Sequence, residues 1–266
     1  RPAYAKTASR PLPRGQAEPE VPVQALAHFA TAFSHDLNGK PDLALEEYCQ
    51  AALANPSYEP VVTEAARRCI RSKKPERAIE ILAKATGLPD ASGTLYAWLG
   101  LAYGQTGKNQ LAIAASRTAI KKMPQALAAY QNLAQLYLQG NKTNEARAVL
   151  DEAARQPATD AGFLVDLADL YSRYLRIQDS KNAVAQGRAQ GLLDRAAKLN
   201  PRNLLILHKL GDGYLQLGQP AKAETAYLQL LTLFPEVSLV RGKLADLYLR
   251  SKQFGKASEQ LQAIAR

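Results

Sequence analysis

The sequence predicts an all-α fold built from a helical repeat, on three observations. Seven alanines recur at a regular interval: five of the six intervals are 34 residues and the fourth is 43. Bulky or small apolar residues follow most of these alanines at spacings of four and seven, which place them on one helix face. A proline then closes most of the repeats. The alanines are Ala44, Ala78, Ala112, Ala146, Ala189, Ala223 and Ala257. A period of this size is typical of arrays in which each unit packs only on its neighbours.

A second small residue lies twelve positions before most of these alanines. These residues are Ala32, Ala66, Gly100, Ala134, Gly211 and Ala245. Small residues at two facing positions let two helices cross closely, while the bulky residue four positions after the alanine fills the space beside them. The third repeat departs from this rule, because Ser116 takes the bulky position. We therefore expect two closely packed helices in each repeat.

Turn residues separate the predicted helices. Between the two helices of a repeat, a tight turn with positive φ favours glycine. The glycines at this place are Gly39, Gly107, Gly140 and Gly218. Between repeats, proline cannot continue the preceding helix. The closing prolines are Pro56, Pro89, Pro124, Pro157, Pro201 and Pro235.

This pattern resembles the tetratricopeptide repeat (TPR) family. Two repeats show the motif most clearly: Tyr96-x-x-Leu99-Gly100-x-x-Tyr103 and Leu207-x-x-Leu210-Gly211-x-x-Tyr214. The resemblance covers about residues 25–266, or seven repeats. It implies a right-handed superhelical solenoid of antiparallel helix pairs, in which the first helix of each pair lines a concave groove.

The predicted organisation is a leader followed by the array. Residues 1–23 are rich in proline and lack apolar periodicity, so we expect them to be extended or disordered on their own. They are either a flexible leader or an arm that orders against a partner. The array then spans 24–266. Its repeats are expected at about 25–58, 59–92, 93–126, 127–160, 161–203, 204–237 and 238–266.

The fifth repeat is longer than the others by nine residues. Helical spacing continues on both sides of residues 179–182, so we predict two lengthened helices around a turn there. The expansion is either a tolerated insertion or an added contact surface.

Composition restricts the compartment and the chemistry only in part. The net charge of +10 favours acidic partners or anionic surfaces without naming nucleic acid. Cys49 and Cys69 lack metal-site or CxxC spacing, so we expect inward-facing thiols and neither a disulfide scaffold nor a metal site.

No apolar run is long enough to predict a membrane span. Ala3-Tyr4-Ala5 resembles the end of a signal-peptide cleavage region, although no apolar segment precedes it. A cytoplasmic and an exported, envelope location both stay open.

The family resemblance also places a partner-binding groove. Carried over to this chain, the groove residues are Gln131, Gln135, Leu138, Asp169, Arg173, His208, Asp212, Leu215, Asp246, Leu249 and Arg250. Asp169, Asp212 and Asp246 recur once per repeat, and they predict a basic or amphipathic protein segment at repeats five to seven. Part of this row has a structural alternative, because Asp169 and Asp246 are each spaced to pair with an arginine one helical turn further on.

A second candidate site is a basic cluster in the second repeat. It comprises Arg67, Arg68, Arg71, Lys73, Lys74 and Arg77. The cluster is either a solvated face or a nucleic-acid contact. No exposed aromatic residues for base stacking are interleaved with it, which makes nucleic acid the weaker interpretation.

The sequence shows no catalytic or cofactor signature. It has no glycine-rich phosphate loop, no HExxH and no GxSxG motif. His28, His35 and His208 have no serine or cysteine nucleophile placed beside them, although His208 and Asp212 share a helix face. We therefore predict a non-enzymatic chain without cofactor or metal.

The predicted function is a protein–protein interaction scaffold or adaptor. A fold-level analogy extends this to the assembly of a larger bacterial envelope or secretion-type complex. One alternative is a nucleic-acid-binding repeat protein. The other is a structural subunit that assembles through its C-terminal end, where Leu261 and Ile264 are expected beside an uncovered face. A second copy, a partner or a further chain segment are the alternatives for what covers this face.

Overall fold

The computed structural model describes residues 22–157, 160–178 and 183–265. Every regular element in these ranges is an α-helix, and no strand occurs among them. The predicted all-α fold class is confirmed. Most of the predicted leader and the predicted turn at 179–182 lie outside the described residues.

The chain divides into two compact units, Arg1–Ala85 and Thr86–Arg266. The helices of the first unit are α1 (Val23–Leu37), α2 (Pro41–Ala54), α3 (Glu59–Arg71) and α4 (Pro75–Thr86). Within this unit α1 packs against α2, and α2 packs against α3. The last residue of α4 is counted with the second unit.

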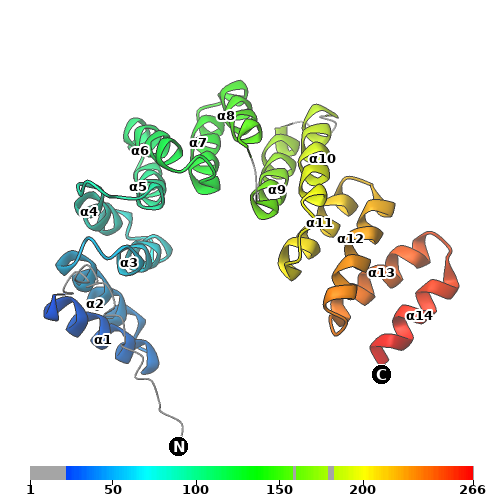
Figure 1. Cartoon of the computed structure of the whole chain (residues 1–266). Coiled ribbons are helices and arrows are strands. Elements are labelled where there is room, and N and C mark those ends of the chain that lie inside the picture. The colour runs from blue at the N-terminus through cyan, green and yellow to red at the C-terminus, as the bar shows by residue number, and fades with distance from the viewer. Residues whose placement is uncertain (1–21, 158–159, 179–182, 266) are drawn as a thin grey trace, which may run out of the picture. The chain divides into compact units, whose positions relative to one another are not determined.

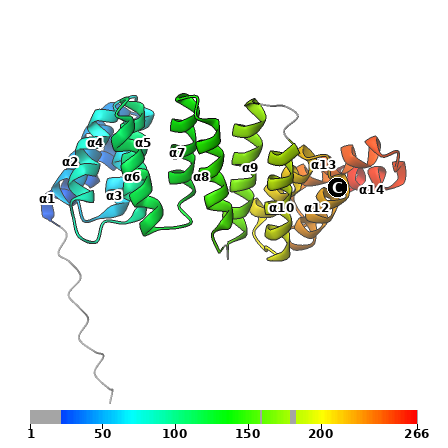
Figure 2. The same ribbon diagram turned by 90° about the horizontal axis from the view of Figure 1, so that it is seen from above.

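The second unit contains five helix pairs. They are α5 (Gly93–Gln105) with α6 (Asn109–Lys122), α7 (Leu127–Gln139) with α8 (Thr143–Arg155), α9 (Ala161–Gln178) with α10 (Ala183–Lys198), α11 (Leu204–Gln216) with α12 (Pro220–Leu233), and α13 (Ser238–Arg250) with α14 (Phe254–Ala265). The two helices of each pair run side by side in opposite directions (Figure 1). Figure 2 shows α7 to α10 standing next to one another in chain order. The first helices also touch in succession: α5 contacts α7, α7 contacts α9, and α9 contacts α11.

The regularly spaced alanines form the innermost layer of the helix pairs. All seven are buried, with at most 1% of their surface exposed. The small residues that precede them are buried as well, and the glycines among them are required by close packing. A Cβ on Gly100 would overlap the Ser116 hydroxyl, and one on Gly211 would overlap the ring of Tyr227. The predicted close crossing of paired helices is therefore confirmed at these positions.

The turns inside the pairs agree with the prediction at three of the four glycines. Gly39, Gly107 and Gly218 have φ values of 66°, 72° and 68°. The prediction was wrong for Gly140, which ends α7 with a φ of −86°, while the next residue, Asn141, takes the left-handed conformation with φ 56°. Asparagine tolerates this region better than most residues, so the turn is made one position later.

The long fifth repeat places its additional residues in its helices. Helices α9 and α10 contain 18 and 16 residues, more than any other helix in the described ranges. The predicted lengthening on both sides of residues 179–182 is thus confirmed. The closing prolines all lie in the links between one pair and the next, as predicted.

Candidate interaction surface

Asp246, Leu249 and Arg250 of the predicted groove lie on α13. The other predicted groove residues lie on α7, α9 and α11, whose successive contacts with one another and with α5 create one surface. We call it the first-helix surface. It contains two adjoining hollows between α5 and α7, and a third between α9 and α11. The chemistry of the two ends differs, and each end is considered in turn.

The end formed by α5 and α7 is uncharged. Its larger hollow has a volume of about 390 Å³ and is walled by Trp98, Leu101 and Leu127. Gln131 and Gln135, which the sequence analysis placed in the groove, line the same hollow. Every residue that lines the two hollows in the described chain is uncharged. This end therefore offers apolar side chains and carboxamides to a partner.

The sequence analysis missed the apolar wall of this hollow. The signal that could have revealed it is Trp98, the single tryptophan of the chain, which is only half-buried although it is large and aromatic. Conversely, Leu138 was predicted in the groove, but it is partly buried and packs against the hydrophobic core.

The end formed by α9 and α11 is charged. Its hollow has a volume of about 210 Å³ and is lined by Asp166, Asp169, Lys209 and Asp212. Lys209 Nζ lies 2.8 Å from Asp166 Oδ1 and so joins α11 to α9. Asp169 pairs along its own helix with Arg173, with 2.9 Å between Oδ2 and Nε. The acids at this end are thus balanced by cations.

Asp212 is more firmly held than the other acids of the predicted row. It accepts hydrogen bonds from the hydroxyl of Tyr227 on α12 and from the ammonium of Lys243 on α13. Burial raises the pKa of this carboxyl, but the bonds from Lys243 and Tyr227 outweigh it and lower the pKa below the usual value. Asp212 therefore connects α11, α12 and α13 through Oδ1, the oxygen that accepts both bonds.

His208 lies one helical turn before Asp212. Its Nδ1 lies 3.6 Å from Asp212 Oδ2, which is too long for a hydrogen bond. Its other ring nitrogen, Nε2, is buried without a hydrogen-bond partner among the described residues. The imidazole instead lies beside the ring of Tyr227, with 6.5 Å between the ring centroids.

The C-terminal part of the predicted groove is the most exposed. Asp246 Oδ2 and Arg250 Nε are 2.9 Å apart, and the two side chains are 60% and 80% exposed. The structural alternative for the acidic row, pairing along one helix, is confirmed here and at Asp169. Leu215 and Leu249 are also exposed.

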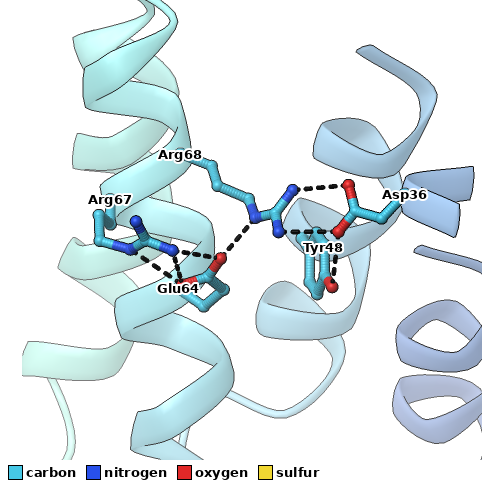
Figure 3. A network of polar contacts seen from close by, with 5 residues as sticks. All are labelled: Asp36, Tyr48, Glu64, Arg67 and Arg68. Atoms are coloured by element: carbon cyan, nitrogen blue, oxygen red, sulfur yellow. Dashed lines mark hydrogen bonds and ion pairs between the residues drawn. The ribbon is translucent and has the colours of Figure 1, made fainter. Parts of the chain in front are cut away.

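The basic cluster of the second repeat is partly neutralised. Arg68 bridges Asp36 and Glu64, Arg67 also binds Glu64, and the hydroxyl of Tyr48 donates to Asp36 (Figure 3). The hydrogen bond from Arg68 lowers the pKa of Asp36, although burial opposes this effect. Arg68 also lies 4.2 Å from the centre of the Tyr48 ring. These contacts tie α1, α2 and α3 together.

The remaining cations of this cluster fall into two groups. Arg77 pairs with Glu46 and with Glu80. Arg71, Lys73 and Lys74 are exposed at the end of α3 and in the turn after it. The cluster is therefore a mixture of ion-paired arginines and solvated cations, and it is not a uniform basic surface.

A recurrent contact between tyrosine, carboxylate and cation links the pairs of the second unit. In each case the tyrosine of a first helix donates to an acid on the preceding helix, and a cation on the following helix binds the same acid. The three sets, which we call clamps, are Tyr171–Asp151–Arg188, Tyr214–Asp194–Lys222 and Tyr248–Glu224–Lys256. The sequence analysis placed Tyr214 in the repeat motif and predicted none of these hydroxyl contacts. The acids do not all share one repeat position: Asp151 and Asp194 lie five residues after the alanine of their repeat, and Glu224 lies one residue after it.

The last helix leaves apolar residues uncovered in the described chain. Phe254, Leu261 and Ile264 are 65%, 49% and 40% exposed. Leu261 and Ile264 occupy the two positions that are buried in the earlier helix pairs, so their exposure agrees with the predicted uncovered face. No helix in the described ranges combines the length and apolar character needed to cross a membrane.

Comparison with known proteins identifies the repeats. Two family models, both described as tetratricopeptide repeat, match residues 105–164 and 208–266. A search of curated proteins found no match. Several solved structures are similar at low sequence identity.

One is the C-terminal part of a TPR repeat-containing protein from Cytophaga hutchinsonii, which is 14% identical with a TM-score of 0.48 over 89% of this chain and 93% of that chain. A tetratricopeptide repeat protein from Parabacteroides merdae is 14% identical with a TM-score of 0.44 over 91% and 92% of the two chains. YrrB, described as a TPR protein with an unusual peptide-binding site, is 17% identical with a TM-score of 0.44 over 70% and 92%. Given the two family matches and the repeated helix pairs, the chain belongs to the tetratricopeptide repeat family.

Proposed function

We propose that the chain is a non-catalytic adaptor that holds a segment of a partner protein on the first-helix surface. Tetratricopeptide repeats generally mediate protein–protein interaction, and the fold is a typical non-catalytic scaffold. The observation that supports this binding place is the hollow beside Trp98, because it combines apolar walls and open space with carboxamide side chains. A role in assembling an envelope or secretion-type complex is a further part of this proposal.

The uncharged end supports binding of an apolar side chain together with peptide backbone. An aliphatic or aromatic side chain of the partner would fill the hollow between Trp98 and Leu127. Gln131 and Gln135 lie one helical turn apart at its edge, and each carboxamide can both donate and accept a hydrogen bond. This is the chemistry that an extended segment with free N–H and C=O groups requires.

The charged end supports a basic or amphipathic continuation of the same segment. The pair Asp169–Arg173 at this end and the pair Asp246–Arg250 on α13, the first helix of the last pair, are exposed, and an exposed ion pair contributes only about 0–1 kcal/mol. A lysine or arginine of the partner can therefore replace the internal cation at little cost. Asp212 is less available for this role, because Tyr227 and Lys243 already bind its Oδ1.

The test uses peptides selected for binding. A random library of peptides of about 12 residues, each long enough when extended to span roughly 40 Å, is selected against the full chain. The affinity of a selected peptide is then measured by the fluorescence of Trp98, which lines the proposed site.

Two leucine variants decide the outcome. Leu101→Lys introduces a charge into the hollow and should weaken binding at least about tenfold, since an unpaired charge facing an apolar wall is costly. Leu111→Lys changes an exposed leucine of α6, which lies outside the surface, and should leave affinity unchanged. Circular dichroism verifies that both variants fold. Equal affinities for the two variants would refute the site.

We propose self-association through α14 as a second function, on the exposure of Phe254, Leu261 and Ile264. A second copy would cover the apolar residues that an additional helix pair covers elsewhere in the array. Light scattering over a concentration series should show a rising molar mass, and Leu261→Glu should abolish the rise. A constant monomer mass at high concentration would exclude this function.

A further inference from the structure

The two cysteines of the chain meet inside the first unit. Cys49 lies on α2 and Cys69 on α3, and their sulfur atoms are 3.4 Å apart. Both are free thiols, with 1% and 0% of their surfaces exposed. A disulfide bond is about 2.0 Å long, so the sulfurs need to approach by about 1.4 Å to form one. The sequence analysis expected two buried thiols but did not place them in contact.

The surroundings make the two thiols unequal. The hydrogen bond from Cys69 and the nearby guanidinium of Arg77 lower the pKa of the Cys49 thiol, although burial opposes them. The same contact and burial raise the pKa of Cys69. Arg77 is held in place by Glu46 and Glu80. Cys49 is therefore the sulfur that becomes a thiolate, which is the reactive form of cysteine.

We propose that Cys49 and Cys69 form a modification site at which a small hydroperoxide produces an intramolecular disulfide between α2 and α3. The Cys49 thiolate attacks one peroxide oxygen, the O–O bond breaks, and water leaves after taking up a proton. The resulting sulfenic acid carries the transferred oxygen. Cys69 sulfur then attacks Cys49 sulfur, the S–S bond forms as the S–O bond of the sulfenic acid breaks, and the departing hydroxyl takes up the Cys69 proton and leaves as a second water. In total, two thiols and one hydrogen peroxide give one disulfide and two waters.

Burial selects the oxidant and directs the product. Both residues are almost fully covered, so an oxidant reaches the sulfurs only when the helices open locally, and hydrogen peroxide needs a much smaller opening than a bulky disulfide reagent. Cys69 already contacts Cys49, so the sulfenic acid is captured before it meets a second peroxide. The bond would join two helices of different pairs and close a loop of twenty residues, which restricts the unfolded chain.

The experiment treats the reduced full chain with hydrogen peroxide under native conditions. We expect the intact mass to fall by two hydrogen atoms, the thiol titre to fall from two to zero, and the chain to stay monomeric on a non-reducing gel. Peptide mapping should recover the Cys49–Cys69 cross-link. Dithiothreitol should reverse all of these changes.

Variants separate native proximity from other routes. Cys69→Ala should let Cys49 gain oxygen atoms without a cross-link, because no second thiol captures the sulfenic acid. Arg77→Gln should slow the oxidation roughly 3–10-fold, because it removes a cation that favours the thiolate. Circular dichroism confirms that the variants are folded.

Three results would overturn the proposal. The first is no reaction, and the second is oxygen addition or cross-linking between chains in place of the internal bond. The third is an oxidation rate that rises with urea in parallel with global unfolding, since the bond would then form only in the unfolded chain.

Discussion

The hydroxyl of Tyr227 donates a hydrogen bond to the carboxylate of Asp212, and the two residues come from the two helices of one pair. The ring of the same tyrosine occupies the space beside Gly211, where a Cβ would overlap it. Lys243 from the next helix completes the contact to Asp212. One tyrosine thus fills the close crossing of α11 and α12 and also holds the carboxylate of Asp212.

The first prediction concerns the space beside Tyr227. Gly211→Ala should lower the free energy of unfolding by about 1–3 kcal/mol, because the added methyl group displaces the ring. The matched control is Gly191→Ala in α10, where a Cβ would meet open space. That variant should gain up to about 1 kcal/mol from the higher helix propensity of alanine. Urea unfolding measures both, and a similar change in the two variants would contradict the packing argument.

The second prediction separates structural from exposed acids. Asp212→Asn should destabilise the chain by about 1–3 kcal/mol, because it leaves the partly buried ammonium of Lys243 without its anion. Asp246→Asn should change stability by less than about 0.5 kcal/mol, because its ion pair with Arg250 is exposed. Thermal and urea unfolding give the two values.

For a peptide with basic residues we expect the opposite order, with Asp246→Asn weakening peptide binding more than Asp212→Asn. The loss of affinity should be smaller at high salt, because salt screens the interaction between exposed charges. If Asp246→Asn destabilised the fold as much as Asp212→Asn, the distinction between the two acids would be wrong.

The third prediction concerns alkaline pH. Burial raises the pKa of Tyr130 to about 12, and burial together with the hydrogen bond to Glu224 raises that of Tyr248 to about 12. In the unfolded chain tyrosine ionises near pH 10, so the unfolded state loses these protons first. Their contribution to stability is complete below about pH 10 and is lost as the pH rises through about 12.

A pH titration followed by circular dichroism and tyrosinate absorbance tests this. Unfolding should begin above pH 10, and the buried tyrosines should ionise together with the loss of helix. The variant Tyr248→Phe should reduce the dependence of stability on pH in this range. Ionisation of all tyrosines near pH 10 with the helices intact would disprove it.

The fourth prediction concerns the turns inside the pairs. Lys252 has a φ of 59° in the turn between α13 and α14, in the region that favours glycine. Lys252→Gly should therefore stabilise the chain by about 1 kcal/mol. Gly107→Ala, at a φ of 72° and with open space around it, should cost about 1 kcal/mol. Thermal unfolding should show a gain in stability for Lys252→Gly and a loss for Gly107→Ala. Changes of the same sign in both variants would rule out backbone strain as the cause of the stability changes.

Much of the fold could be predicted from the sequence because the packing positions recur with the repeat. Ala44 and Ala223 lie far apart in the chain, yet both occupy the same buried place in a helix pair. The repeat pattern could not predict that Asn141, and not Gly140, takes the left-handed conformation after α7, because either residue can end a helix in this way.

The candidate site was less predictable, for a physical reason. The partners of Asp212 lie 15 and 31 residues further along the chain, on two other helices, and no local spacing reveals them. By contrast, the pair Asp169–Arg173 follows from helical spacing alone. The wall around Trp98 depends on the contact of α5 with α7, which the repeat pattern implies but whose lining residues it does not specify.

The clamps of the second unit have a consequence for how the chain unfolds. The first spans α8, α9 and α10, the second spans α10, α11 and α12, and the third spans α12, α13 and α14. Because neighbouring clamps share α10 and α12, opening one helix removes polar partners from the pairs on both sides. Such coupling between nearest neighbours makes a linear array cooperative. Amide hydrogens from α8 to α14 should therefore exchange as a single group.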